Sequence, residues 1–437
     1  MMKKIVFQFI LLWLCFAFID FNHSAAAKVY VDIDSPTFRP IPIAIADFNN
    51  RAPGAAGQTG MGGVIAEAVR QDLALTGIFN ILNQKGFLET NVATDKINSS
   101  DWTPLGADYL LKGEVVKNDQ DIIANGYLFD VSRGEFILAR KYRVAAGQSK
   151  ALSRAIAVDI MRALVNDEGD FNTKIAFVPK NGLKSDIHSI GYDGTDLKSM
   201  TSHKSILLTP RWSPDGNFLA FTSFKRGRPE IYIRNLKNGL ERKVAAFTGI
   251  NLCGTFSPDG RKLLLTLSKD GNNEIYSLDI SSLLLRRLTN NHAIDVSPSW
   301  SPDGKKIAFV SNRSGSPQIY TMDADGGNVK RITYEGTYNS SPVWSPRGDA
   351  IAYEGQSHSR YQIFIIDAEG GNPKQLTSNN ANNESPSWSP SGRQIVYVSR
   401  NQSRSKIVIM NSNGSSPRQL YETSGKLVTP SWSPRLR

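Results

Sequence analysis

The chain has 437 residues, with 51 lysines and arginines against 40 aspartates and glutamates, and a formal net charge of +11. This length predicts two domains rather than one, and the modest charge suits a place near an anionic cell-envelope surface without requiring one. Because the basic residues form no cluster or run, the sequence argues against nucleic-acid binding.

The first 27 residues have the pattern of a secretory signal peptide. Lys3 and Lys4 precede an apolar run over residues 5–19, and small residues from Ala25 to Ala27 end the segment. We therefore expect export, with cleavage after Ala27. A retained membrane anchor is the alternative, but the run is shorter than the ~20 apolar residues that span a bilayer. No later run is longer, so the mature chain is expected to be peripheral to membranes, not inserted.

Residues 28–168 lack any repeat and predict an N-terminal α/β domain. A strand is expected at Pro42–Ala46, followed by a glycine-rich loop over residues 54–63 and a helix from about Gly62 that Gly77 stops. The loop has neither the third glycine of a dinucleotide site nor the lysine of a P-loop, which favours a structural role. Further strands are expected at Tyr109–Val116, Ile122–Phe129 and Phe136–Val144, and a second helix carries Leu152, Ile156, Ile160 and Leu164, with Ser149 as its N-cap.

An aromatic residue followed by Ser-Pro recurs every 44 residues in the rest of the chain. A unit of this length with apolar strand columns and hairpin turns such as Ser301–Gly304 predicts one four-stranded propeller blade. The aromatic column is expected to pack between neighbouring blades. Its members are Trp212, Phe256, Trp300, Trp344, Trp388 and Trp432.

The ends of the repeat give the number of blades. Lys174–Val178 matches Lys306–Val310 at three periods, but Glu168 occupies the aromatic position that should precede it. Trp432 stands six periods later and supplies the missing strand. We therefore predict a six-bladed β-propeller over residues 169–437, in which the last strand completes the first blade and leaves no free sheet edge.

No constellation of residues predicts catalysis, a cofactor or a metal. Gly355–Ser359 lacks the final glycine of a nucleophile elbow, the histidines have no metal-ligand spacing, and Asp323–Gly326 suggests a hairpin more than a calcium loop. Cys253 is the only cysteine left after the signal peptide is removed, so no intramolecular disulfide can form, and inert packing in a strand is the favoured role.

The loops that enter the inner strands differ between blades while the framework repeats. Binding residues usually lie on such loops, although ordinary solvated loops would look the same. We predict a partner-binding surface at this mouth of the ring. Its candidate residues are Ile250, Asn251, His292, Asp295, Val296, Tyr338, Asn339, Asn383 and Glu384.

These repeats, the preceding α/β domain and the export signal together resemble the TolB family, periplasmic propeller proteins of the Tol-Pal system. Residues 29–34 and 39–42 are similar to the mature N-terminus of that family, and residues 75–80 and 105–109 to its first domain. The departures are Arg347, Ser391 and Arg435, which replace a turn aspartate, and the lack of a histidine at 250–252.

The resemblance implies a periplasmic protein-binding scaffold that has no enzymatic activity and no cofactor. Its propeller mouth would bind the peptidoglycan-associated lipoprotein Pal, and residues 28–39 would contact TolA, in support of outer-membrane integrity and envelope constriction during cell division. The implied contact residues of this N-terminal segment are Lys28, Tyr30, Asp32, Asp34 and Arg39.

The alternative is a propeller enzyme, either lactonase-like or related to the prolyl oligopeptidases. The sequence ends five residues after Trp432, where a peptidase would need a hydrolase domain, and it offers no inner-strand set of carboxylates and histidines for a lactonase. A binding scaffold is therefore the favoured interpretation.

Overall fold

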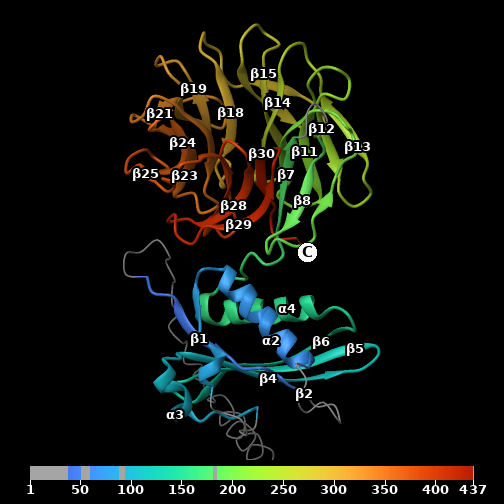
Figure 1. The fold of residues 1–437 in the computed structure, drawn as a ribbon. Coiled ribbons are helices and arrows are strands. Elements are labelled where there is room, and N and C mark those ends of the chain that lie inside the picture. The colour runs from blue at the N-terminus through green and yellow to red at the C-terminus, as the bar shows by residue number, and fades with distance from the viewer. Residues whose placement is uncertain (1–37, 51–59, 88–93, 181–184, 437) are drawn as a thin grey trace, which may run out of the picture.

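The computed structural model describes residues 38–50, 60–87, 94–180 and 185–436. The predicted signal peptide and residues 28–37 of the predicted N-terminal binding segment lie outside the described residues. Within them the chain forms an α/β domain followed by a ring of six four-stranded sheets (Figure 1), which confirms the predicted fold class. In these ranges no helix has both the length and the apolar character needed to cross a membrane.

The N-terminal domain is a mixed sheet with two helices on one face, and both helices lie between the sheet and the ring (Figure 1). The strand order is β3-β1-β4-β5-β6, with β2 beside β4. The helices bury apolar residues three or four positions apart, such as Ile65, Val69 and Leu73. The elements are β1 (Ile41–Ile45), β2 (Asn49–Asn50), α2 (Met61–Leu75), β3 (Phe79–Ile81), η1 (Gln84–Gly86), α3 (Ser99–Trp102), η2 (Thr103–Leu105), β4 (Tyr109–Lys117), β5 (Asp121–Asp130), β6 (Glu135–Ala145) and α4 (Ser149–Val165).

The predicted N-cap of the second helix is wrong by one residue. Ser149 is the first residue of α4, and Gln148 precedes it as the N-cap without a side-chain hydrogen bond. The backbone explains the shift, because the Gln148 carbonyl already accepts hydrogen bonds from the amides of Ala151 and Leu152. A residue whose carbonyl accepts the first helical bond occupies the cap position whatever its side chain.

Each propeller sheet is an antiparallel meander whose first strand lies at the centre of the ring. The β-sheets are β10 (Leu207–Trp212), β11 (Phe218–Ser223), β12 (Glu230–Asn235), β13 (Glu241–Ala245); β14 (Asn251–Phe256), β15 (Lys262–Leu267), β16 (Glu274–Asp279), β17 (Leu285–Arg287); β18 (Asp295–Trp300), β19 (Lys306–Ser311), β20 (Gln318–Asp323), β21 (Lys330–Arg331); β22 (Asn339–Trp344), β23 (Ala350–Ser357), β24 (Arg360–Asp367), β25 (Lys374–Gln375); β26 (Asn382–Trp388), β27 (Gln394–Arg400), β28 (Ser405–Asn411), β29 (Arg418–Thr423); and β30 (Lys426–Trp432), β7 (Lys174–Lys180), β8 (His188–Gly191), β9 (Lys198–Ser199).

The aromatic column packs between neighbouring sheets, as the sequence predicts. Trp300 belongs to the same apolar cluster as Leu264 and Ile275 of the preceding sheet. The indole Nε1 of Trp388 donates to the Val343 carbonyl of the preceding inner strand at 3.1 Å. Burial of these large side chains therefore joins each blade to the next.

The predicted closure of the ring is confirmed by the pairing of β30 with β7. Val428 lies opposite Val178, and Trp432 lies opposite Ile175. The Trp432 indole also donates to the Thr173 hydroxyl at 2.9 Å. The last strand of the chain thus completes the sheet that β7 begins, and both ends of the propeller sequence stabilise one blade.

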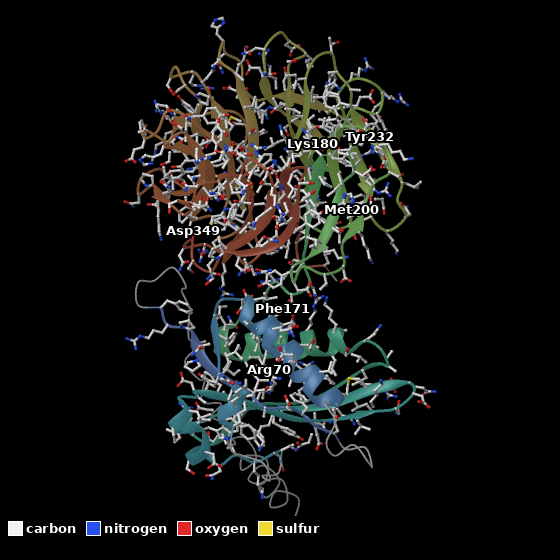
Figure 2. The ribbon with its side chains drawn as sticks, in the orientation of Figure 1. Arg70, Phe171, Lys180, Met200, Tyr232 and Asp349 are labelled. Atoms are coloured by element: carbon white, nitrogen blue, oxygen red, sulfur yellow. The ribbon has the colours of Figure 1, made fainter. Side chains whose placement is uncertain are left out.

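The N-terminal domain packs against two blades, and Phe171 lies at this junction (Figure 2). Its ring is buried in an apolar cluster that includes residues of both domains. The carbonyl of Leu75, at the end of α2, accepts hydrogen bonds from Tyr192 Oη at 2.5 Å and Gln394 Nε2 at 3.0 Å. Arg154 of α4 forms an ion pair with Asp193 at 2.8 Å.

A buried carboxyl group makes this junction sensitive to pH. Burial raises the pKa of Asp72 to about 6, although Arg154 opposes the shift. The folded state therefore holds the proton more tightly than the unfolded chain, so ionised Asp72 destabilises the fold above pH 6 and this penalty disappears below the ordinary pKa of 3.8.

We expect Asp72→Asn to remove this pH dependence. The free energy of unfolding of the variant minus that of the wild type should rise by on the order of 3 kcal/mol between about pH 4 and pH 7.5. Urea unfolding at several pH values measures the difference. Parallel pH profiles for the two proteins would contradict the assignment to Asp72.

Candidate functional site

The two ends of the ring carry different features, since the loops that enter the inner strands lie at one end and the contacts with the N-terminal domain at the other. In a four-stranded meander the loops that enter the inner strands lie at one end, together with the hairpins that join the second and third strands. The contacts with the N-terminal domain come from the other end, for example from Gln394 at the start of β27 and Asp193 after β8. We call the end with the entering loops the mouth face, and it is the end away from these contacts.

Part of the predicted binding set is accessible at the mouth face. Ile250 has 39 % of its surface exposed, and His292 is exposed as well. Val296, Tyr338 and Glu384 are half-buried. These five side chains remain candidates for contact with a partner.

The other four predicted mouth residues are buried and hold the loops in place. Asn251 accepts a hydrogen bond from the Phe247 amide and donates one to the carbonyl of the same residue. Asn339 donates to the Gln318 side chain and the Glu335 carbonyl, both at 2.8 Å. The residues with this positioning role are Asn251, Asp295, Asn339 and Asn383.

Arg39, from the predicted N-terminal segment, is the member of that set that the structure describes, and its side chain is exposed. Lys28, Tyr30, Asp32 and Asp34 lie outside the described residues. Arg39 stands two residues before β1 (Ile41–Ile45) and is thus accessible to solvent.

The sequence did not single out a polar recess at the mouth face. It is a cavity of about 390 Å³ between the β23–β24 and β27–β28 hairpins. Arg400 donates a hydrogen bond to Glu384 across one side of it, at 2.6 Å. The sequence signal was Ser359, which stands where three other blades have a glycine in this hairpin, at Gly227, Gly271 and Gly315. The lining residues are Arg360, Asn380, Asn382, Arg400, Asn401, Gln402 and Ser403.

Two carboxylates lie close to this recess and differ in their surroundings. Burial raises the pKa of Glu384, although Arg400 opposes the shift and Glu354 adds to it. Glu354 accepts hydrogen bonds from the Ser340 hydroxyl and from the Ser385 amide. Glu384 is therefore a half-buried carboxylate paired with Arg400, and a carboxylate at the mouth suits a basic or hydrogen-bond-donating partner.

The inner strands line a narrow central channel with a repeated backbone irregularity. Pairing between the first two strands of each blade skips two residues, as between Val296 and Ser299. The first of the two unpaired residues has positive φ in five blades and is followed by proline. This strained backbone conformation therefore recurs around the channel. These residues are Thr209, Ser297, Ser341, Ser385 and Thr429.

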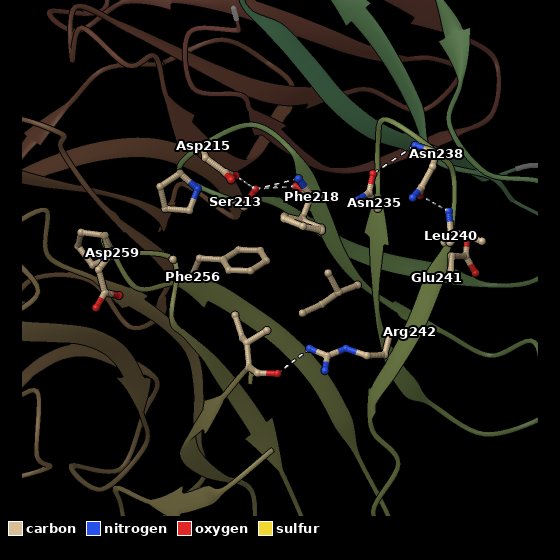
Figure 3. A pocket seen from close by; sticks show the side chains of 15 residues that line it. Ser213, Asp215, Phe218, Asn235, Asn238, Leu240, Glu241, Arg242, Phe256 and Asp259 are labelled. Carbon is tan, nitrogen blue, oxygen red and sulfur yellow. Dashed lines mark hydrogen bonds between the residues drawn. The ribbon is translucent and has the colours of Figure 1, made fainter. Parts of the chain in front are cut away.

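A wide cavity lies at the opposite end, between the sheets that begin with β10 and β14. It has a volume of about 890 Å³, and Phe218 and Phe256 are among the residues that line it (Figure 3). Its polar groups pair within the chain: Ser213 donates to Asp215, and Arg242 donates to the Ile280 carbonyl. This cavity is apolar and distant from the mouth face.

A serine, a histidine and a glutamate form a connected set in the β10–β13 blade. His203 Nδ1 lies 3.1 Å from Ser223 Oγ, and its Nε2 lies 2.7 Å from a Glu241 carboxylate oxygen. The order of contacts resembles that of a hydrolase triad. Ser223 is fully buried, however, so a substrate could not reach its hydroxyl. These contacts are best explained as structural, because they hold the loop that carries His203 against the blade.

Cys253 is buried in the inner strand β14, and burial raises the pKa of its thiol to about 12, although Arg211 opposes the shift. A neutral, inaccessible thiol fits the predicted packing role. Within the described ranges, no three His, Cys, Asp or Glu side chains come together in a way that could hold a metal ion.

Two family models match the chain. One, described as the TolB beta propeller domain, matches residues 161–436, and the other, described as the TolB amino-terminal domain, matches residues 29–137. The crystal structure of TolB from Acinetobacter baumannii is similar with a TM-score of 0.81 and 32 % identity. That similarity covers 91 % of this chain and 97 % of the other.

Curated relatives give the same family over a shorter stretch. The Tol-Pal system protein TolB of Syntrophus aciditrophicus is 46 % identical over 234 residues, which is 51 % of each chain. The protein of the same name from Nitrosomonas europaea is 33 % identical over 243 residues, which is 55 % of this chain and 53 % of the relative. The chain thus spans about half the length of the curated relatives it matches.

Proposed function

Because this chain belongs to the TolB family, we propose that it is an exported, non-enzymatic scaffold of the Tol-Pal system that binds other proteins. The mouth face would bind the peptidoglycan-associated lipoprotein Pal, and residues 28–39 would contact TolA. The scaffold would act in the periplasm after cleavage at Ala27, and would support outer-membrane integrity and constriction of the envelope in cell division.

The observation that carries the proposal is the accessible mouth face of a ring whose other end contacts the N-terminal domain. Exposed and half-buried side chains such as Ile250, His292 and Tyr338 surround the entering loops, and buried amides fix the backbone beneath them. The Tyr338 ring contacts that of Tyr361 edge to face, with centroids 5.4 Å apart. A rigid surface with aromatic and apolar side chains is suited to protein docking.

A pair of matched substitutions tests this surface. Ile250 and Leu240 are both exposed apolar residues, but they lie at opposite ends of the ring. We expect Ile250→Asp to weaken Pal binding by about 2 kcal/mol, or roughly thirtyfold, because it buries a charge at a central contact. Leu240→Asp should leave the affinity unchanged. Isothermal titration of purified Pal into each protein measures both effects.

Equal affinities of the wild type and the Ile250→Asp variant would contradict the placement of Pal at the mouth face. An affinity loss in the Leu240→Asp variant alone would move the site to the other end of the ring. Thermal unfolding of both variants controls for loss of the fold, which substitution of an exposed side chain should not cause.

The proposed TolA contact is tested separately, by deletion of residues 28–39. Because Arg39 is exposed and Phe38 is only half-buried against the core, we expect the deletion to cost some stability but to spare the fold and to keep Pal affinity. TolA affinity should fall at least about tenfold, or 1.4 kcal/mol. A variant that no longer folds, or that binds TolA as the full chain does, would contradict this assignment.

A further inference from the structure

One residue breaks the chemical pattern of the inner strands. The position before the aromatic residue is uncharged in five blades, and in three of them its hydroxyl accepts a hydrogen bond from the backbone of the next inner strand, as Thr255 does from Trp300 at 3.0 Å. In the sixth blade it is Arg211, which cannot accept a hydrogen bond. Those five residues are Thr255, Ser299, Val343, Ser387 and Ser431.

The Arg211 guanidinium lies in the central channel without a counter-charge. It lines both a narrow cavity of about 90 Å³ and a wider one of about 400 Å³. Its Nη1 donates to the Pro210 carbonyl at 3.1 Å, whereas its Nε is buried and has no hydrogen-bond partner. Among the described residues it forms no ion pair, and the one ionisable neighbour that affects it is the neutral Cys253 thiol.

Other unpaired polar groups line the same channel. The hydroxyl oxygens of Thr209 and Thr429 are buried without a partner, and both residues line the narrow cavity with Arg211. Arginine nitrogens only donate, and a hydroxyl can donate. The common chemistry of these groups is therefore that of an anion site.

The energy of a buried charge supports the same conclusion. Arg211 is half-buried at the channel wall, where an ion without a counter-charge is unfavourable, and burial lowers the pKa of its guanidinium. An arginine nevertheless remains protonated at physiological pH. An anion that accepted hydrogen bonds from the guanidinium would offset this cost and would satisfy the free Nε.

We propose that the channel binds one small inorganic oxyanion, phosphate or sulfate, held by Arg211 with the hydroxyls of Thr209 and Thr429. The narrow cavity of about 90 Å³ has room for such an ion, since a water molecule takes about 30 Å³ in the liquid. Thr209 belongs to β10 and Thr429 to β30, so the ion would bridge the closing strand and the next inner strand. The proposal is independent of the Pal site.

Phosphate titration at constant ionic strength tests the proposal on the full chain without its predicted signal peptide. We expect the melting temperature to rise with phosphate up to about 50 mM, because a ligand of the folded state stabilises it. Arg211→Ser, which installs the residue type of three other blades, should lower phosphate affinity at least about tenfold. Arg286→Ser, an exposed arginine outside the channel, is the matched control and should keep the full response.

The proposal is overturned if the wild type shows no response to phosphate or sulfate, or if Arg211→Ser responds as the wild type does. Should that variant fail to fold, phosphorus-31 NMR of phosphate with the wild-type protein decides the question. A line that the protein broadens and that added sulfate sharpens again supports the site, and an unaffected line refutes it.

Discussion

Truncation of the chain before Lys426 is expected to prevent formation of the closed ring. β30 supplies the inner strand of the blade that also contains β7, and its removal takes away the buried Leu427 and Trp432. Loss of a buried tryptophan side chain alone costs about 3–5 kcal/mol. Because whole proteins are stable by only about 5–15 kcal/mol, and β7 would become an open edge, we expect a misfolded or aggregating product.

The control is a shorter truncation that removes residues 435–437. It keeps the pairing of β30 with β7 but loses the ion pairs of Arg435 with Asp167 and Asp170 and the hydrogen bond from the Leu436 amide to the Asn172 carbonyl. A loss of about 1–3 kcal/mol is expected, with the closed ring retained. Soluble yield, circular dichroism and analytical ultracentrifugation compare the two proteins. A folded, monomeric product from the longer truncation would show that the ring does not depend on closure by β30.

The sequence predicts this architecture well because the residues that pack between blades recur at a fixed interval. Trp300 and Trp344 occupy equivalent contacts between blades, so the 44-residue spacing reports the blade directly. Closure of the ring was predicted because Trp432 supplies the aromatic position that Glu168 leaves empty before the first blade. The boundary of α4 was harder, because backbone geometry and not the hydroxyl of Ser149 decides where the helix begins.

The binding surface was predicted less well, for a reason that the sequence itself contains. Asn251, Asp295, Asn339 and Asn383 also recur every 44 residues, and recurrence at the repeat interval indicates a framework role. Contact residues should differ between blades, as those around the polar recess do. The link between His203 and Glu241 could not be read from the sequence, since it joins residues 38 positions apart across a blade.

Replacement of Asp295 by alanine is expected to reduce stability and not to remove a direct contact. One carboxylate oxygen accepts hydrogen bonds from Arg313 at 2.9 Å and from Asn291 at 2.7 Å. The Arg313 guanidinium also lies over the rings of Phe309 and Tyr320. Breaking a buried ion pair costs about 3–5 kcal/mol, and the partial exposure of Arg313 lowers our expectation to about 2–3 kcal/mol.

Asp295→Asn is the matched control, because asparagine stands at the equivalent position in three other blades. Its amide oxygen can still accept from Asn291, so a loss of about 1 kcal/mol or less is expected. Urea unfolding gives the stabilities, and titration with Pal gives the affinities. If Asp295 positions the loop, Pal affinity should fall only in the alanine variant and together with its stability. An alanine variant as stable as the wild type that no longer binds Pal would instead make Asp295 a contact residue, which would require the entering loop to open on binding.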